Sequence, residues 1–381
     1  MIIERRADLD FLRVAAILLL HLYHCGRFFN ADDPWHLKAP QLLPVLNQPM
    51  DILHILRMPL LMLIAGAVAA YAIERRGLPG FAWDRMKRLL LPLLFGMLVV
   101  VPPQIYLEYL DRGRISGSYW GFWTSVFQLV PYPKGSLSWH HLWFVAYLFV
   151  YCLLALPIFA WLDRPSGRAF LRRTEAFLAR NWNLLWLVVP ILAIRIFLRH
   201  RPETNDLLHD PKGFLFYGYL FLTGHLLARC SAVWARLVTL RWTFLGLGLL
   251  LLAILLPDGE FPFPLEHVAV WLFSWTTLLA ILGFARRGIR QEGPRLRHAQ
   301  SLAYPFYILH QTVILAVGYP LMRPAMNPWA RLGWVTLLSF LATWALCEGL
   351  SRVPWLRPLF GMGPVHRAAP AGSALPQPSE V

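Results

Sequence analysis

The chain has 381 residues, of which 57% are hydrophobic and only 15% are charged. Soluble proteins carry about 25% charged residues, so the composition excludes a soluble globular protein and predicts that most of the chain lies in a membrane. The net charge of +15 does not indicate nucleic-acid binding, because the excess Lys and Arg are distributed by loop. The first apolar run is too long for a signal peptide and no small-residue cleavage site follows it, so we expect no cleavable signal.

Ten apolar segments predict an all-α, polytopic integral membrane protein with about ten transmembrane helices. The fourth to seventh segments are the weakest, because several are short or contain Pro. Residues 363–381 are rich in Pro, Ala and Ser, which predicts a disordered cytoplasmic tail behind a membrane domain over residues 1–362. The segments are approximately 9–29, 51–73, 89–110, 141–162, 182–199, 214–228, 242–257, 265–285, 302–322 and 332–353.

The distribution of Lys and Arg predicts the topology. The N-terminus, every second loop and the C-terminal tail hold 23 of these residues, whereas the alternate loops hold nine. Because cytoplasmic loops are enriched in Lys and Arg, both termini are expected in the cytoplasm. An even number of spans agrees with this orientation.

Arg13 and His24 lie eleven residues apart in the first segment. This spacing is three helical turns within about 20°, so both side chains share one face, about 16 Å apart along the axis. Asp10 precedes Arg13 by three residues and can neutralise its charge. A structural ion pair and an interfacial histidine are the alternative interpretation. Because imidazole is suited to proton transfer near neutral pH, we expect His24 to be catalytic.

Three further arginines are candidate binding groups. Arg85 and Arg88 precede the third segment, where they could bind a phosphate or simply anchor the loop. Arg57 lies in the outer half of the second segment, where we expect it to face a wet cavity and hold a carboxylate or an oxyanion. A salt bridge to Asp51 is the alternative for Arg57.

Tyr307 and His310 are neighbours on one helix face of the ninth segment. We expect them to line the same cavity as His24, although a structural Tyr–His hydrogen bond is the alternative. Glu348, near the end of the tenth segment, is a candidate counter-ion for Arg13 or for the loop arginines.

No metal site is predicted. The run Trp139–Trp143 contains two adjacent histidines, which point in different directions on a helix, so it fits an interfacial belt or a sugar-stacking platform better than a metal centre. The cysteines show no metal or redox spacing and are expected to be buried hydrophobes. They are Cys25, Cys152, Cys230 and Cys347.

Six stretches, taken together, resemble acyltransferase family 3, a family of membrane acyltransferases. They follow in the family's order from residue 5 to about residue 362, and the RMP and HLWF segments most resemble the branch that succinylates osmoregulated periplasmic glucans. The stretches are LDFLRVAAILLLHLYH, RMPLLMLIAG, RMKRLLLPLLFG, HHLWFVAYLFVY, SLAYPFYILHQ and CEGLSRVPWLRPLFGM.

The resemblance implies a ten-helix protein that moves an acyl group, acetyl or succinyl, from cytoplasmic acyl-CoA to a hydroxyl of a periplasmic or extracytoplasmic carbohydrate. By position, it implies that His24 is the catalytic histidine and that Arg13 is its partner. Arg85 and Arg88 match the family's R-x-x-R pair on the CoA side. Acyl-CoA is then the donor substrate, and no permanently bound cofactor is expected.

The ninth segment, with Tyr307 and His310, also matches the family. One departure is Ala65-Gly66, where relatives often have Ser-Gly, so a role for that hydroxyl is not available. In the mechanism we expect, the pantetheine arm passes Arg13 and His24 removes the proton of the acceptor. Arg57 or Tyr307 stabilises the oxyanion, and a covalent acyl-histidine stays open as a variant.

A different function class also stays open: a transporter or exporter of an envelope glycan or lipid, with the polar side chains lining its passage. A multi-pass location in the bacterial inner membrane is expected in either case. The sequence does not predict the acyl group, the acceptor or the oligomeric state.

Overall fold

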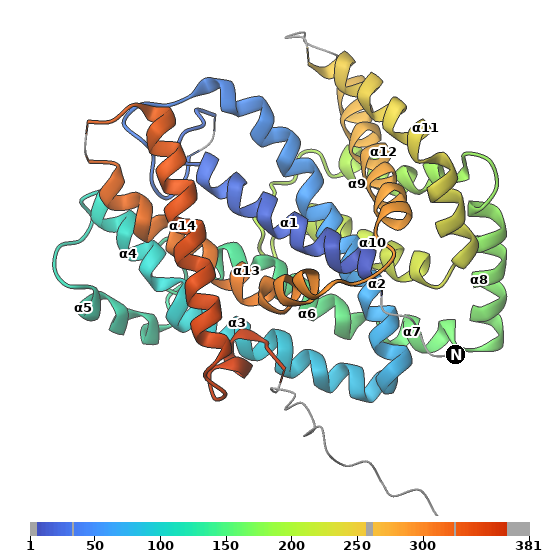
Figure 1. Cartoon of the computed structure of the whole chain (residues 1–381), viewed down its shortest axis with the longest axis horizontal. Helices are drawn as coiled ribbons and strands as arrows, with labels where there is room; N and C mark the ends of the chain where they lie inside the picture. The colour runs from blue at the N-terminus through green and yellow to red at the C-terminus, as the bar shows by residue number, and fades with distance from the viewer. Residues whose placement is uncertain (1–5, 33, 257–261, 324, 364–381) are drawn as a thin grey trace, which may run out of the picture.

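The computed structural model describes residues 6–32, 34–256, 262–323 and 325–363, which form an all-α protein (Figure 1). Among these residues, the β pairing is limited to an isolated bridge between Pro131 and Leu137. The predicted tail lies outside the described residues, except for Gly363. The α-helices are α1 (Ala7–Gly26), α2 (Asn47–Arg85), α3 (Leu91–Phe95), α4 (Pro102–Asp111), α5 (Tyr119–Trp123), α6 (Trp143–Leu154), α7 (Leu156–Leu162), α8 (Pro165–Leu178), α9 (Val188–Phe197), α10 (Pro211–Ala228), α11 (Ser231–Leu255), α12 (Leu265–Gly288), α13 (Pro294–Leu321) and α14 (Pro328–Ser351).

Six helical stretches in the described part of the chain are long and apolar enough to cross a membrane. A seventh results if residues 140–154 and 156–162, which are bent by 47°, form one span. The ten predicted segments fall mainly on helical structure. The prediction of a multi-pass membrane protein is therefore confirmed, while ten spans and two cytoplasmic termini stay predictions.

One of the six stretches runs over 68 residues, Pro44–Asp111. It is not one straight helix, because Gly77 within α2 has a φ of 68°, which is outside the helical range and accessible to glycine. Figure 1 shows the chain turning at the end of α2 and continuing toward α3 in another direction. The predicted segments 51–73 and 89–110 therefore lie on different arms of this stretch.

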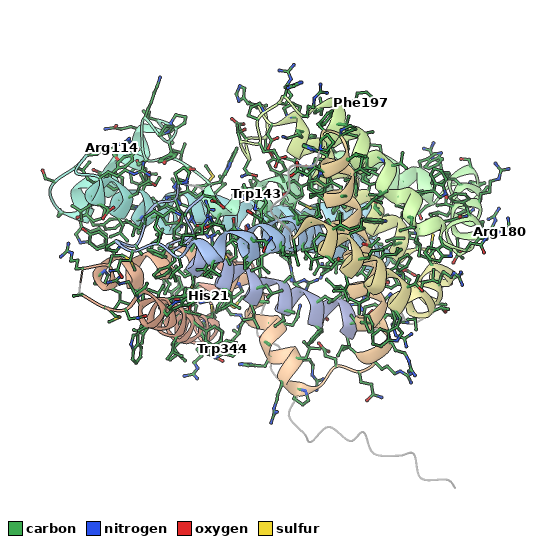
Figure 2. All side chains as sticks on the ribbon, turned by 90° about the horizontal axis from the view of Figure 1, so that it is seen from above. His21, Arg114, Trp143, Arg180, Phe197 and Trp344 are labelled. Carbon is green, nitrogen blue, oxygen red and sulfur yellow. The ribbon has the colours of Figure 1, made fainter. Side chains whose placement is uncertain are left out.

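Helix α1, which carries Arg13 and His24, packs against α2, α12, α13 and α14. One side of α1 is buried in the bundle, while Phe11, Leu18 and Leu22 are exposed on the other and fit a lipid-facing stripe. Figure 2 shows the bundle from another side, with Arg180 at its edge. The face of α1 that bears the predicted site residues therefore points into the protein.

Helices α2 and α10 approach each other closely through two glycines. A Cβ atom added at Gly66 would lie 1.9 Å from the backbone oxygen of Phe221, and one added at Gly224 would lie 2.0 Å from that of Leu63. Small residues of this kind let transmembrane helix backbones come close together. Gly66 of the Ala65-Gly66 pair is thus explained by helix packing.

Residues 163–181, expected to be a loop, contain helix α8. The apolar-segment criterion misses this helix because it is amphipathic: Leu171 and Leu178 are buried, whereas Arg172 and Arg173 are exposed. Such a helix suits the surface of a membrane rather than its interior.

Candidate active site

A cavity of about 730 Å³ lies among α1, α2, α13 and the segment that follows α14. The side chains of Arg76 and Arg88 are each 42% exposed, so this end of the cavity meets the surface. Apolar side chains, including Ile17, Leu61 and Phe144, line other parts of it. Many guanidinium groups around one opening favour a polyanionic ligand. The arginines lining the cavity are Arg6, Arg13, Arg75, Arg76, Arg85, Arg88 and Arg357.

Asp84 holds three of these arginines in place. Its carboxylate lies 2.7 Å from Nη1 of Arg76 and 2.9 Å from Nε of Arg88, and it also binds Arg85. One negative charge against three positive charges leaves the cluster cationic while fixing its geometry. The sequence analysis singled out Arg85 and Arg88 but missed Asp84, although its i, i+4 spacing to Arg88 is a readable signal.

Arg13 lines the same cavity from α1, together with Asp10. The predicted ion pair is present, with 3.3 Å between Nη1 of Arg13 and Oδ1 of Asp10. Because both side chains line the cavity, the pair is available to a bound ligand as well as to the helix.

Tyr307 separates the cavity from the histidines. Its ring lines the cavity, together with Ala65, and its hydroxyl donates a hydrogen bond to the backbone oxygen of His141. His24 is not among the residues lining the cavity. The cavity in this conformation therefore ends short of His24, with Tyr307 at the boundary.

Three histidines from three elements meet beyond Tyr307. The ring centroids of His24 and His310 are 5.2 Å apart, and those of His310 and His141 are 5.4 Å apart. His24 and His310 are therefore neighbours. Of the three side chains expected to line one cavity, however, only Tyr307 does so, and His24 and His310 lie behind it. The third ring, His141, comes from the 3₁₀ turn His140–Leu142 before α6. The sequence analysis noted its run of residues but did not connect it with His24.

The hydrogen bonds of His310 define its tautomer. Nδ1 lies 2.6 Å from the backbone oxygen of Tyr307, which can only accept, so Nδ1 carries the proton and Nε2 presents a lone pair. The alternative Tyr–His side-chain bond is wrong, because the Tyr307 hydroxyl is bonded to residue 141 and the two rings are 5.9 Å apart.

The expectation that Arg57 faces the cavity is wrong, because Arg57 is not among the residues that line it. It is buried, its guanidinium lies 3.5 Å from the centroid of the Tyr23 ring, and Nη2 is 3.3 Å from Nδ1 of His54. A cation–π contact with an aromatic face is the physical reason why this charge can leave water. The Tyr23 ring in turn contacts that of His24, with 5.3 Å between centroids. Arg57 therefore approaches the histidines through Tyr23.

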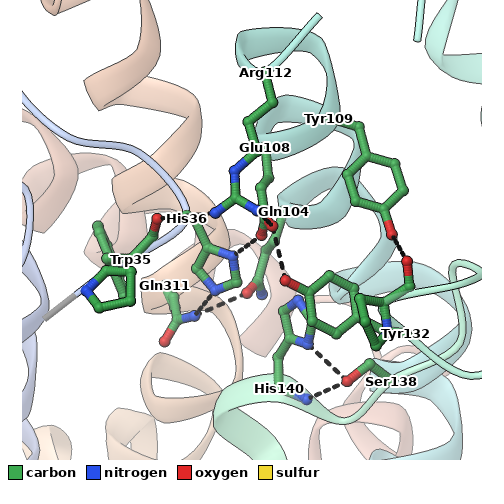
Figure 3. Close-up of polar contacts among 12 residues, drawn as sticks. Trp35, His36, Gln104, Glu108, Tyr109, Arg112, Tyr132, Ser138, His140 and Gln311 are labelled. Atoms are coloured by element: carbon green, nitrogen blue, oxygen red, sulfur yellow. Dashed lines mark hydrogen bonds and ion pairs between the residues drawn. The ribbon is translucent and has the colours of Figure 1, made fainter. Parts of the chain in front are cut away.

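A second polar cluster, which we call the outer cluster, lies next to the histidines, at His36 and Glu108 (Figure 3). Nδ1 of His36 donates to Glu108, and the Glu108 carboxylate also binds the Tyr132 hydroxyl at 2.7 Å and Nη1 of Arg112 at 2.8 Å. Burial, together with the bond to Glu108, raises the pKa of Tyr132 to about 12, so Tyr132 stays a donor at neutral pH. His36 and Glu108 are 72 residues apart and were missed, because no local pattern links them.

His140 completes this outer cluster. Its ring stacks on that of His36, with 4.8 Å between centroids and 23° between planes. Nδ1 of His140 is 2.6 Å from the Ser138 hydroxyl. The backbone of His140 has a φ of 40°, an uncommon conformation for a residue with a side chain. The adjacent His141 instead bonds to Ile308, so the two neighbouring histidines point to different partners, as expected.

Two glutamines connect the two groups of histidines. Nε2 of Gln104 is 3.2 Å from Nδ1 of His141, and its Oε1 accepts from Nε2 of Gln311 at 3.0 Å. The same Gln311 amide donates to Nε2 of His36 at 3.2 Å. A continuous polar chain thus runs from His141 to the pair of His36 and Glu108.

Glu348 does not pair with Arg13. Its carboxylate is 2.6 Å from Nε2 of His298 at the surface. The cysteine prediction, in contrast, is confirmed. The buried free thiols are Cys25, Cys152, Cys230 and Cys347.

Comparison with known proteins identifies the family. The chain matches the model of an acyltransferase domain over residues 6–348. It is also 23% identical over 380 residues to glucans biosynthesis protein C of Escherichia coli, with 95% of this chain and 96% of that protein covered. No solved structure matches the chain. The arginine-lined cavity thus lies in a chain that belongs to acyltransferase family 3, a family of membrane acyltransferases.

Proposed function

We propose that this acyltransferase moves an acyl group, acetyl or succinyl, from cytoplasmic acyl-CoA to a hydroxyl of an extracytoplasmic carbohydrate. The observation that carries this proposal is one cavity with arginines at its open end and Tyr307 at its inner boundary. Behind Tyr307 lies His310, whose ring contacts that of His24. Acyl-CoA acts as the donor substrate rather than as a resident cofactor.

The cavity has the chemistry that acyl-CoA needs along its length. The phosphates bind the guanidiniums of Arg85, Arg88 and their neighbours through charge-assisted hydrogen bonds. The pantetheine arm extends past Arg13 toward the apolar lining. Arg13 and His24 are about 16 Å apart along the α1 axis, which is a length that such an arm can cover.

In the reaction we propose, His24 takes the proton of the acceptor hydroxyl while the hydroxyl oxygen attacks the thioester carbonyl. The carbon–sulfur bond then breaks, and the CoA sulfur receives that proton from His24. The Tyr307 hydroxyl stabilises the oxyanion once it releases the backbone oxygen of His141, and this rotation also opens the cavity toward His24. Arg57 supports His24 through the Tyr23 ring that lies between them. His310 supports His24 by direct contact of the two rings.

The membrane arrangement follows from the charges of the loops. Ten spans, with both termini in the cytoplasm of a bacterial inner membrane, put the cavity arginines of residues 75–88 on the cytoplasmic side. Residues 30–50 and 111–140, which carry the outer cluster, are then on the opposite side. A glucan is the acceptor that the name of the Escherichia coli relative supports.

The test is CoA release by detergent-purified protein. With acetyl-CoA or succinyl-CoA and a glucan oligosaccharide, we expect free thiol to appear only when both substrates are present, and the acyl mass to appear on the oligosaccharide. Binding and passage of a glycan without thiol release would instead support an exporter and overturn the proposal.

A further inference from the structure

Four buried polar atoms that lack a hydrogen-bond partner among the described residues belong to the histidine groups. They are Nδ1 of His24, Nε2 of His310, Oε1 of Gln311 and Nε2 of His140. His310 is 0% exposed and Gln311 is 3% exposed. Buried polar groups are rarely left unpaired in proteins, so several such atoms in neighbouring side chains indicate that a polar ligand completes their bonds.

These four atoms belong to one connected group of side chains. His24 contacts His310, Gln311 follows His310 in α13, and the Gln311 amide reaches Nε2 of His36 at 3.2 Å. His36 in turn stacks on His140. The group therefore extends from the predicted catalytic histidine to the outer cluster.

The chemistry of these atoms selects a class of ligand. Nε2 of His310 presents a lone pair, because Nδ1 of that ring carries the proton, and Oε1 of Gln311 is a carbonyl oxygen. Both atoms can only accept hydrogen bonds. A ligand that satisfies them must donate, which favours hydroxyl groups over phosphates or carboxylates.

Aromatic rings lie beside these atoms. The Trp35 ring stacks on His24 with 6.0 Å between centroids and 20° between planes, and it lies 5.6 Å from the His36 ring. The Tyr132 ring meets His140 edge to face at 4.9 Å. A ligand with hydroxyl edges and apolar ring faces, as sugars have, matches hydrogen-bond acceptors that alternate with flat rings.

The geometry fits a metal ion less well, although His36, Glu108 and His140 each offer a ligand atom within 4.8 Å of the others. Histidine lone pairs lie in the ring plane, so two rings stacked at 23° do not converge on one ion. The Glu108 carboxylate is also already bound by Arg112, Tyr132 and His36.

We infer that the side chains from His24 to His140 form a subsite for the carbohydrate acceptor: Gln311, His310 and His140 bind its hydroxyls, and His36, held by Glu108, positions the Gln311 amide. This inference rests on the proposed function. In this arrangement the reacting hydroxyl lies at His24, and the remainder of the sugar lies toward His36 and His140. The cluster reaches the surface at Arg112, whose side chain is 37% exposed.

The test compares His140→Phe with His209→Phe. The first change keeps a ring at the stacked position and removes Nε2, together with Nδ1 and its contact to Ser138. The second is the control, because the His209 side chain is 76% exposed in another loop. Binding of neutral oligosaccharides, including a linear glucan, is measured by titration calorimetry on purified protein. Acyl-CoA and acceptor KM values are measured in parallel. We expect His140→Phe to weaken oligosaccharide binding and raise the acceptor KM at least tenfold, with an unchanged acyl-CoA KM, whereas His209→Phe changes none of the three.

If His140→Phe fails to fold, Gln311→Asn replaces it, because the shorter amide withdraws Oε1, and the same tenfold effect is expected. Unchanged oligosaccharide affinity in the folded variants, or stoichiometric zinc in the wild type that is lost on His36→Ala, overturns the subsite. Oligosaccharide binding that depends on His140, without any acyl transfer, would overturn the proposed function while the subsite stands. Acyl transfer with an unchanged acceptor KM in both variants would overturn the subsite while the proposed function stands.

Discussion

Arginine side chains at one end of the site and histidine side chains at the other provide opposite kinds of contact. The guanidiniums around Asp84 offer donors and positive charge. His310 and Gln311 offer acceptors. In the function that we propose, a phosphate-bearing donor and a hydroxyl-bearing acceptor bind to these different parts, with Tyr307 between them.

At the residue scale, Arg88→Ala tests the donor end. Hydrogen bonds to charged groups contribute about 1.5–3 kcal/mol, so we expect the KM for acyl-CoA to rise about tenfold or more, while the acceptor KM is unchanged. The matched control is Arg173→Ala, because Arg173 is exposed on α8 and does not line the cavity. An unchanged donor KM for Arg88→Ala would remove the phosphate role of this arginine.

His24→Ala tests the chemical step. General acid–base catalysis by one side chain contributes about 100-fold to 10,000-fold, so kcat should fall by at least the lower figure, while binding of acyl-CoA persists. Size-exclusion profile and thermal unfolding check that the variant is folded and inserted. Acyl transfer at the wild-type rate would show that His24 has no part in the mechanism.

At the scale of elements, the contact of α2 with α10 holds one wall of the cavity. Gly66→Ala places a methyl group against the backbone oxygen of Phe221. Overpacking of this kind costs about 1–3 kcal/mol, so we expect a lower Tm and less folded protein in the membrane. Thermal unfolding followed by size exclusion measures the change.

Gly246→Ala in α11 is the control for this prediction, because a Cβ there meets nothing within 4 Å. Alanine is favoured over glycine in a helix by about 1 kcal/mol, so this change should keep or raise the Tm. Equal Tm values for the two variants would mean that the close approach at Gly66 is not what limits helix packing.

The elements also show what the sequence can predict. The apolar segments and the shared face of Arg13 and His24 follow from helix periodicity, which is local. The pair of His36 and Glu108 depends on a loop meeting α4, and the burial of Arg57 depends on Tyr23. Such contacts are decided by tertiary packing, so the sequence of a single segment does not predict them.

At the scale of the whole molecule, the predicted topology can be tested by thiol labelling. The four native cysteines are buried, so the wild type should give little background. A membrane-impermeant maleimide should label Leu208→Cys, an 85% exposed position, in intact cells. Gln291→Cys, exposed between α12 and α13, should react only after lysis. The reverse labelling pattern would show that the protein has the opposite orientation in the membrane.

Transfer across the bilayer, from a cytoplasmic donor to an acceptor on the far side, can be measured in reconstituted vesicles. Acyl-CoA with a labelled acyl group is supplied outside vesicles in which the arginine-lined cavity faces outward, and a glucan oligosaccharide is enclosed inside. We expect labelled oligosaccharide in the lumen and free CoA outside, with neither formed by His24→Ala. Acylation that occurs only when both substrates are on the same side of the membrane would contradict it.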